Sequence, residues 1–161
     1  QFGKYGTALW QKAHGIDDSP VEAYDERKSI STERTFTKDT MDIRSIRSLL
    51  LSISDKLGHE LRQRGQVCSC VSVKIRYADF NTFSKQKHIP YCANDRTLST
   101  LALELFDAVY ERRQMIRLVG LRYSGLVQGH HQIRLFEETT EDICLMQQLD
   151  HIRCKFGSKA I

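Results

Sequence analysis

Residues 67–77 show the clearest alternation of apolar and polar positions in the chain. Val67, Val71, Val73, Ile75 and Tyr77 fall on one side of the alternation. The other side holds Cys68, Cys70, Ser72, Lys74 and Arg76. A period of two places successive side chains on opposite faces of a β-strand. The pattern therefore predicts a strand with one apolar face and one polar, cationic face.

Two longer stretches repeat with the helical period instead. The first carries Ile43, Ile46, Leu49, Leu50, Ile53, Leu57 and Leu61, and Gly65 follows it. The second carries Leu98, Leu101, Leu105 and Val109. This spacing predicts two amphipathic helices, each with one apolar stripe. Short polar side chains cap helix starts, so we expect Asp39 or Thr40 before the first helix and Asn94 or Asp95 before the second.

Three further stretches read as strands, two of them unusually polar. In "DERKSISTERTF", residues 25–36, only Ile30 and Phe36 are clearly apolar, and residues 81–88 are also polar. The last strand is expected within residues 115–126. There we place Ile116, Leu118, Leu121 and Tyr123 toward the core. A bulge at Gly120 would then bring Arg117 and Arg122 to the same open face, because glycine inside a strand often marks a bulge.

The predicted order of elements is β-α-β-β-α-β. It indicates an α+β fold, a two-layer sandwich of a four-stranded antiparallel sheet with two helices on one face and the other face open. A short N-terminal helix with Leu9, Trp10 and Ala13 precedes it and stops near Gly15. A C-terminal helix follows, with an apolar stripe of Ile143, Met146, Leu149, Ile152 and Phe156.

The composition of the chain is typical of a globular protein. Its 161 residues, 40% hydrophobic and 27% charged, suffice for one domain with appendages. No stretch reaches the roughly 20 apolar residues of a membrane span. The chain starts at Gln1, which suggests a processed product or an excised piece. No leader is visible, and five cysteines suggest no disulfide framework, so we expect a cytoplasmic location without a membrane partner.

The positive charge of the chain is concentrated in its middle. Residues 27–127 hold 18 Lys and Arg against 10 Asp and Glu, a net charge of +8. Residues 1–26 carry −3 and residues 128–161 carry −1. A basic block between acidic ends suggests a polyanion partner, and the alternative is an ordinary solvated surface.

Side chains that bind phosphate recur on the predicted strands and at their ends. The candidates for DNA binding are Lys28, Ser29, Arg34, Thr35, Lys74, Arg76, Thr82, Ser84, Lys85, Lys87, Arg117, Arg122 and Ser124. Arg and Lys neutralise phosphates, and hydroxyl groups donate hydrogen bonds to them. No aromatic pair offers a stacking platform on the open face, which favours duplex over single-stranded nucleic acid.

Metal binding and catalysis have weaker support. Cys68, Cys70, His88 and Cys92 supply four potential zinc ligands, but the C-x-C spacing differs from the usual knuckle, and such cysteines are commonly small hydrophobic residues. No base is evident for a nucleophile, and no acidic pair in the strands is suited to holding two metal ions. We therefore expect no catalytic residue and no bound metal in this chain.

Four segments together resemble Y-family translesion DNA polymerases of the DNA polymerase IV type. "FGKYGTALWQKAHGIDDSPV" resembles the end of their thumb domain, and "RKSISTERTF", "VSVKIRYADFNTFSKQK" and "IRLVGLRYSGL" resemble strands of their little finger domain. The resemblance implies a division into the end of the thumb at 1–18, a linker at 19–26, a little finger domain at 27–127 and a tail at 128–161.

The resemblance also implies a function. The little finger of this family contacts backbone phosphates of the template-primer duplex, as the charge pattern independently suggests. The palm, which holds the catalytic carboxylates, and the fingers would be missing. This chain alone should then be inactive, and the parent polymerase would use Mg²⁺. The alternative is a free-standing α+β module that binds protein or RNA.

The tail contains a second resemblance. "QIRLF" is similar to the peptide by which bacterial polymerases bind the sliding clamp, with Gln132 at the pocket rim and Leu135 and Phe136 inside it. This would place the parent protein in a bacterium. The alternative is that Leu135 and Phe136 only cover the core.

Overall fold

The computed structural model describes residues 3–21, 27–111, 113–129 and 139–157. Its elements in chain order are α1 (Gly3–Ala13), β1 (Ser29–Thr40), α2 (Ile43–Gln63), β2 (Gln66–Tyr77), β3 (Thr82–Cys92), α3 (Asp95–Val109), β4 (Ile116–Ser124), β5 (Val127–Gln128) and α4 (Thr139–Phe156). The predicted β-α-β-β-α-β order and the two additional helices are confirmed. The short β5 is an addition that the sequence did not indicate.

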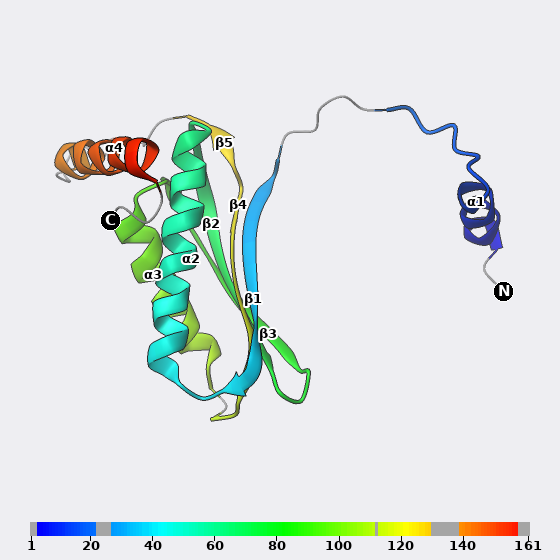
Figure 1. Cartoon of the computed structure of the whole chain (residues 1–161), viewed down its shortest axis with the longest axis horizontal. Coiled ribbons are helices and arrows are strands. Elements are labelled where there is room, and N and C mark those ends of the chain that lie inside the picture. Colours follow the sequence, from blue (N-terminus) through cyan, green and yellow to red (C-terminus); the bar gives the residue numbers. More distant parts are fainter. Residues whose placement is uncertain (1–2, 22–26, 112, 130–138, 158–161) are drawn as a thin grey trace.

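The sheet is antiparallel and has the strand order β1-β4-β2-β3, with β5 pairing beside the start of β2. The edges of the sheet are therefore β1 and β3, which are the two most polar long strands. Helices α2 and α3 lie side by side on one face of the sheet (Figure 1). Among the described elements, none packs on the opposite face, so the two-layer arrangement with an open face is confirmed.

The core lies between the helices and the sheet. The predicted stripes of both helices supply it, with Ile46, Leu50, Leu57 and Leu61 from α2 all at most 1% exposed. Tyr123 of β4 reaches across this layer, and its hydroxyl lies 2.7 Å from the Ser54 hydroxyl of α2. Burial, which disfavours the phenolate, raises the pKa of Tyr123. The Ser54–Tyr123 pair is therefore a neutral hydrogen bond inside an apolar layer.

The start of α2 differs from the prediction. Asp39 and Thr40 belong to β1, which runs longer than expected, and Asp42 caps the helix by accepting from the N–H groups of Arg44 and Ser45. Thr40 accepts from the Asp42 N–H instead and so stabilises the turn before the cap. The N-terminal cap of α3 is as predicted, because Asn94 accepts hydrogen bonds from the first N–H groups of that helix.

The predicted bulge at Gly120 is wrong. Gly120 pairs in regular register with Glu33 on one side and Lys74 on the other. The register shifts instead between Arg76 and Tyr77, whose partners on β4 are Leu118 and Ile116. The extra residue is Arg117. This extra residue shifts the alternation by one, so Leu118 lies opposite Arg76 on the open face. It is outside the core cluster where it was expected, although only 8% of it is exposed.

The two terminal helices are attached differently. Helix α1 lies apart from the sheet (Figure 1), and its Leu9 and Trp10 are 64% and 59% exposed. Helix α4 packs near the ends of α2 and α3. Its predicted apolar stripe is only partly covered, since Ile152 and Phe156 are exposed. Ion pairs between α4 and α2, from Asp150 and Arg153, contribute to its attachment.

No helix in the described part of the chain is long and apolar enough to span a membrane.

Candidate nucleic-acid interface

The strand register divides the polar side chains between the two faces of the sheet. Ile30, Tyr123 and Val71 form one row across β1, β4 and β2, and all three are buried under the helices. The neighbouring row, Ser31, Arg122 and Ser72, must face the other way because adjacent positions alternate. The open face therefore carries the odd-numbered residues of β1 and the even-numbered residues of β3, of the main part of β4 and of β2 from Cys70 onward, beyond the register shift at Cys68.

Eight of the predicted DNA-binding residues lie on this open face. They are Ser29, Thr35, Lys74, Arg76, Thr82, Ser84, Arg122 and Ser124. The alternation also places Ser31, Ser72 and Gln86 among them, which the sequence reasoning did not include as candidates. The period-two alternation of β2 would have been enough to assign Ser72 to this face from the sequence. We call these eleven residues the open polar face.

Hydroxyl groups hold the arginines of the open polar face in place. The Arg76 Nε–H donates to the Thr82 hydroxyl at 2.8 Å, and an Arg122 Nη2–H donates to the Ser29 hydroxyl at 3.0 Å. Each guanidinium has five N–H donors, so most remain available in both residues. The arrangement offers two oriented cations to an anion above the sheet.

Glu33 is the acidic member of the same face, and its position explains its presence. It forms an ion pair with Lys74 across β4. Gly120 lies between them, and a Cβ there would come within 2.8 Å of the Glu33 Cγ. Glycine at position 120 therefore opens the path for the Glu33 side chain. The pair neutralises one of the three cations, which leaves Arg76 and Arg122 as the main positive groups.

Three predicted residues lie on the helix side of the sheet edges. Lys85 and Lys87 project beside α3, where Lys85 pairs with Glu111 at 3.0 Å and Lys87 with Glu104 at 3.4 Å. Arg34 lies opposite Val119 on the helix side of β1. The two lysines are thus already paired with carboxylates. Sequence alone located these cations on strands but not on a common face.

The remaining two candidates lie outside the regular ladder. Lys28 is exposed just before β1. Arg117 is the extra residue of β4, where its guanidinium lies 4.6 Å from the centre of the Phe80 ring and 3.7 Å from Asp39. The clamp-like peptide with Gln132, Leu135 and Phe136 lies outside the described residues.

The cysteines of the sheet behave as small hydrophobic residues. Cys68 belongs to the core, and burial raises its pKa to about 12. Its thiol donates to the Cys92 carbonyl at 3.4 Å. Cys70 pairs with His88 in the strand ladder, but in the described part of the chain no three His, Cys, Asp or Glu side chains converge as a metal site would require.

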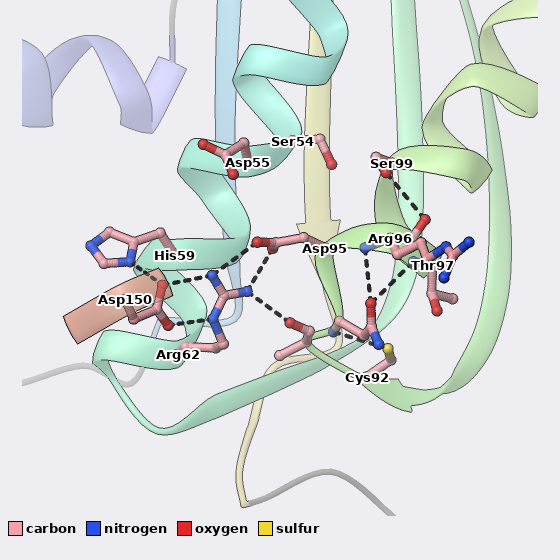
Figure 2. A network of polar contacts seen from close by, with 12 residues as sticks. Ser54, Asp55, His59, Arg62, Cys92, Asp95, Arg96, Thr97, Ser99 and Asp150 are labelled. Carbon is pink, nitrogen blue, oxygen red and sulfur yellow. Dashed lines mark hydrogen bonds and ion pairs between the residues drawn. The ribbon is translucent and has the colours of Figure 1, made fainter. Parts of the chain in front are cut away.

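A partly buried polar network joins α2, α3 and α4 at one end of the helix layer (Figure 2). Arg62 donates to Asp95 at 2.6 and 2.9 Å and to Asp150 at 2.6 and 2.9 Å. It also donates to the Ala93 carbonyl, and His59 bonds to Asp150 at 2.8 Å. Burial alone would lower the pKa of Arg62, but the hydrogen bonds to Asp150 and Asp95 raise it. No sequence pattern indicated this network, because its members are far apart in the chain.

Comparison with known proteins adds independent information. Residues 27–135 match the impB/mucB/samB family C-terminal domain. The chain is 36% identical to the DNA polymerase IV of Clostridium acetobutylicum over 166 residues, which cover 100% of this chain and 42% of that protein. It is 35% identical to the DNA polymerase IV of Dehalococcoides mccartyi strain 195 over 158 residues, or 97% of this chain and 40% of that protein. A Streptococcus pneumoniae DNA polymerase IV is 36% identical over 126 residues. The chain thus spans less than half the length of these curated relatives.

Proposed function

The chain belongs to the impB/mucB/samB family, through its C-terminal domain, and we propose that its open polar face binds the phosphate backbone of template-primer DNA. The observation that carries the proposal is the sharing of one uncovered sheet face by Arg76, Arg122 and a set of hydroxyl groups. Such donors bind phosphate oxygens and carry no direct information on base sequence. The binding would therefore be non-specific.

In this proposal the chain serves a longer translesion polymerase during DNA damage bypass and repair. The relatives it matches are named DNA polymerase IV, which supports a polymerase parent. The described residues of this chain do not fit a Mg²⁺ site, because no cluster of carboxylates converges. Palm, fingers and the remainder of the thumb would supply the metal site and the catalysis, and this chain would hold the duplex.

The proposal can be tested by measuring how DNA affinity depends on salt. Fluorescence anisotropy with a labelled primer-template duplex should give an affinity that falls steeply with salt and hardly changes with sequence. Replacing Arg76 and Arg122 by Gln should flatten the log–log salt slope by about one per lost phosphate contact. Replacing Lys85 and Lys87, which pair with α3, is the matched control and should leave the slope nearly unchanged.

Two outcomes would contradict this function. A DNA affinity that is undetectable or insensitive to salt removes phosphate binding as its basis. Tighter binding to single-stranded RNA than to duplex DNA, or no nucleic-acid binding at all, would favour the alternative of a free-standing α+β interaction module.

The peptide from Gln132 to Phe136 adds a second proposed partner, the bacterial sliding clamp. Its support is the sequence pattern alone, since Leu135 and Phe136 match two apolar anchors after a hydrogen-bonding Gln. Replacing both anchors by Ala should abolish binding of the chain to a purified clamp, while DNA binding stays unchanged. Undiminished clamp binding would remove this motif from the proposal.

A further inference from the structure

A polar groove lies on the helix side of the β1 edge, away from the open polar face. It has a volume of about 400 Å³ and lies between β1, α2 and α4. Arg34 of β1, Lys56 and His59 of α2 and Arg153 of α4 all line it. Strand β1 and helix α2 are neighbours in the chain and supply most of the lining, whereas α4, which is distant in sequence, contributes Arg153.

The charges of the groove leave an excess of cations. Its two carboxylates are already engaged, since Asp55 accepts from Arg153 at 2.7 Å and Glu33 pairs with Lys74 across the sheet. By contrast, neither Arg34 nor Lys56 forms an ion pair with any residue that the structure describes. Two cations without an ion-pair partner among the described residues, beside neutralised carboxylates, favour an anionic occupant.

Arg153 supplies a second, independent observation. Its side chain is only 10% exposed, and its Nε is buried and has no hydrogen-bond partner among the described residues. Buried N–H groups are nearly always paired, so this one is an unsatisfied donor in the groove wall, which an outside acceptor reaches once the Arg153 side chain shifts. The Asp55 carboxylate meets a different nitrogen of the same guanidinium, and Nε is left for the occupant.

We infer that this groove binds a phosphate group, with Arg34 and Lys56 as its exposed donors and with a small shift of the Arg153 side chain bringing its Nε–H to the same anion. A phosphate carries several acceptor oxygens, and it can therefore accept from more than one cationic side chain at once. This assigns Arg34 to a site separate from the open polar face. The phosphate can come from a nucleic-acid strand that passes the β1 edge or from a free phosphate or nucleotide, because both present the same chemistry.

The Nε–H group of Arg153 provides a direct readout by ¹⁵N–¹H NMR of the 161-residue chain. Titration with inorganic phosphate should shift its cross-peak saturably. Lys56→Gln and Arg34→Gln should each weaken that binding by about tenfold, which is the loss expected for one charge-assisted hydrogen bond. Arg44→Gln is the matched control, because Arg44 is an exposed cation of the same helix outside the groove. It should leave the phosphate affinity unchanged.

A second titration separates the two sources of phosphate. If the Arg153 cross-peak moves with inorganic phosphate, the site accepts a free anion. If it moves only with a primer-template duplex, and the shift is lost in Lys56→Gln but kept in Arg76→Gln, the site takes the nucleic-acid backbone. Both results support the inference. A cross-peak that moves with neither ligand, or a shift that is equal in wild type and Lys56→Gln, overturns it without affecting the proposed role of the open polar face.

Discussion

At the scale of single residues, Arg62 shows how one side chain gives two carboxylates different properties. Its guanidinium lies between Asp95 of α3 and Asp150 of α4, with closest contacts of 2.6 Å to each. Both carboxylates bond to Arg62, but Asp150 also bonds to His59. Burial raises the pKa of Asp95 despite its bonds to Arg62. Asp150 is less buried, and although burial opposes the effect, its bonds to Arg62 and His59 lower its pKa.

These opposite shifts predict an order of titration. As pH falls, Asp95 should take up a proton above the ordinary aspartate value of 3.8, whereas Asp150 should remain ionised below it. The side-chain ¹³C chemical shifts of the two residues measure both steps. In Arg62→Gln, the pKa of Asp150 should rise toward its ordinary value, because its main hydrogen-bond donor is gone.

The same shifts fix the sign of the effect on stability. Asp150 has a lowered pKa, so its contribution is complete above the unfolded value and is lost as pH falls through its folded pKa. Asp95 has a raised pKa, so lowering the pH through that value should slightly stabilise the fold. A pKa of Asp95 below 3.8 would contradict burial as the dominant effect there, and a pKa of Asp150 above 3.8 would contradict the dominance of its hydrogen bonds.

At the scale of elements, the approach of α2 to α3 depends on Gly58. A Cβ at this position would overlap the Asp95 carboxylate. Gly58→Ala should therefore destabilise the domain by about 1–3 kcal/mol, the usual cost of overpacking, although alanine favours the helix by up to about 1 kcal/mol. Urea denaturation followed by circular dichroism measures this difference in the free energy of unfolding.

Two companion variants make the Gly58 experiment specific. Ser48→Ala, at an exposed position of the same helix, should change stability by less than about 0.5 kcal/mol. In an Asp95→Ala background, Gly58→Ala should cost less, because the overlapping carboxylate is gone. Equal costs in both backgrounds would show that the close approach does not involve Asp95.

The helices and strands also show which features of the fold can be predicted from the sequence. The stripes of α2 and α3 and the alternation of β2 were predictable, because each element buries one face and must repeat with its own period. The bulge was placed wrongly at Gly120. Glycine there accommodates Glu33, and the register shift occurs at Arg117, where no residue type signals it. The cap at Asp42 was missed because β1 continues to Thr40.

At the scale of the whole molecule, the sheet separates cations that the sequence presents as one group. Arg76 and Arg122 share the open polar face, whereas Lys85, Lys87 and Arg34 lie on the helix side of the edge strands. The edge strands are polar on both faces, so their own pattern does not specify which side chains point outward. Pairing with β4 and β2 decides it, and that pairing is a property of the whole sheet.

The attachment of α4 is the feature of the whole molecule that can be tested most directly. Asp150 joins α4 to Arg62 and His59, and Arg153 joins it to Asp55, while Ile152 and Phe156 of the same helix remain exposed. Because Asp150 bonds to both Arg62 and His59 of α2, Asp150→Asn should weaken the attachment by about 2 kcal/mol, the usual worth of a hydrogen bond between charged groups.

Hydrogen exchange measures the effect of Asp150→Asn separately for each helix and strand. In Asp150→Asn, the amides of α4 should exchange faster, whereas those of β2 and β4 should keep their protection, because none of the α4 side chains that the structure describes belongs to the core between the sheet and the helices. Asp107→Asn, which breaks the exposed pair with Arg47, is the control and should leave α4 unchanged. If α4 stays protected in Asp150→Asn, or if β2 and β4 lose protection with it, then the helix is not a separately attached unit. The phosphate groove, which needs Arg153 in place, would then depend on the stability of the entire domain.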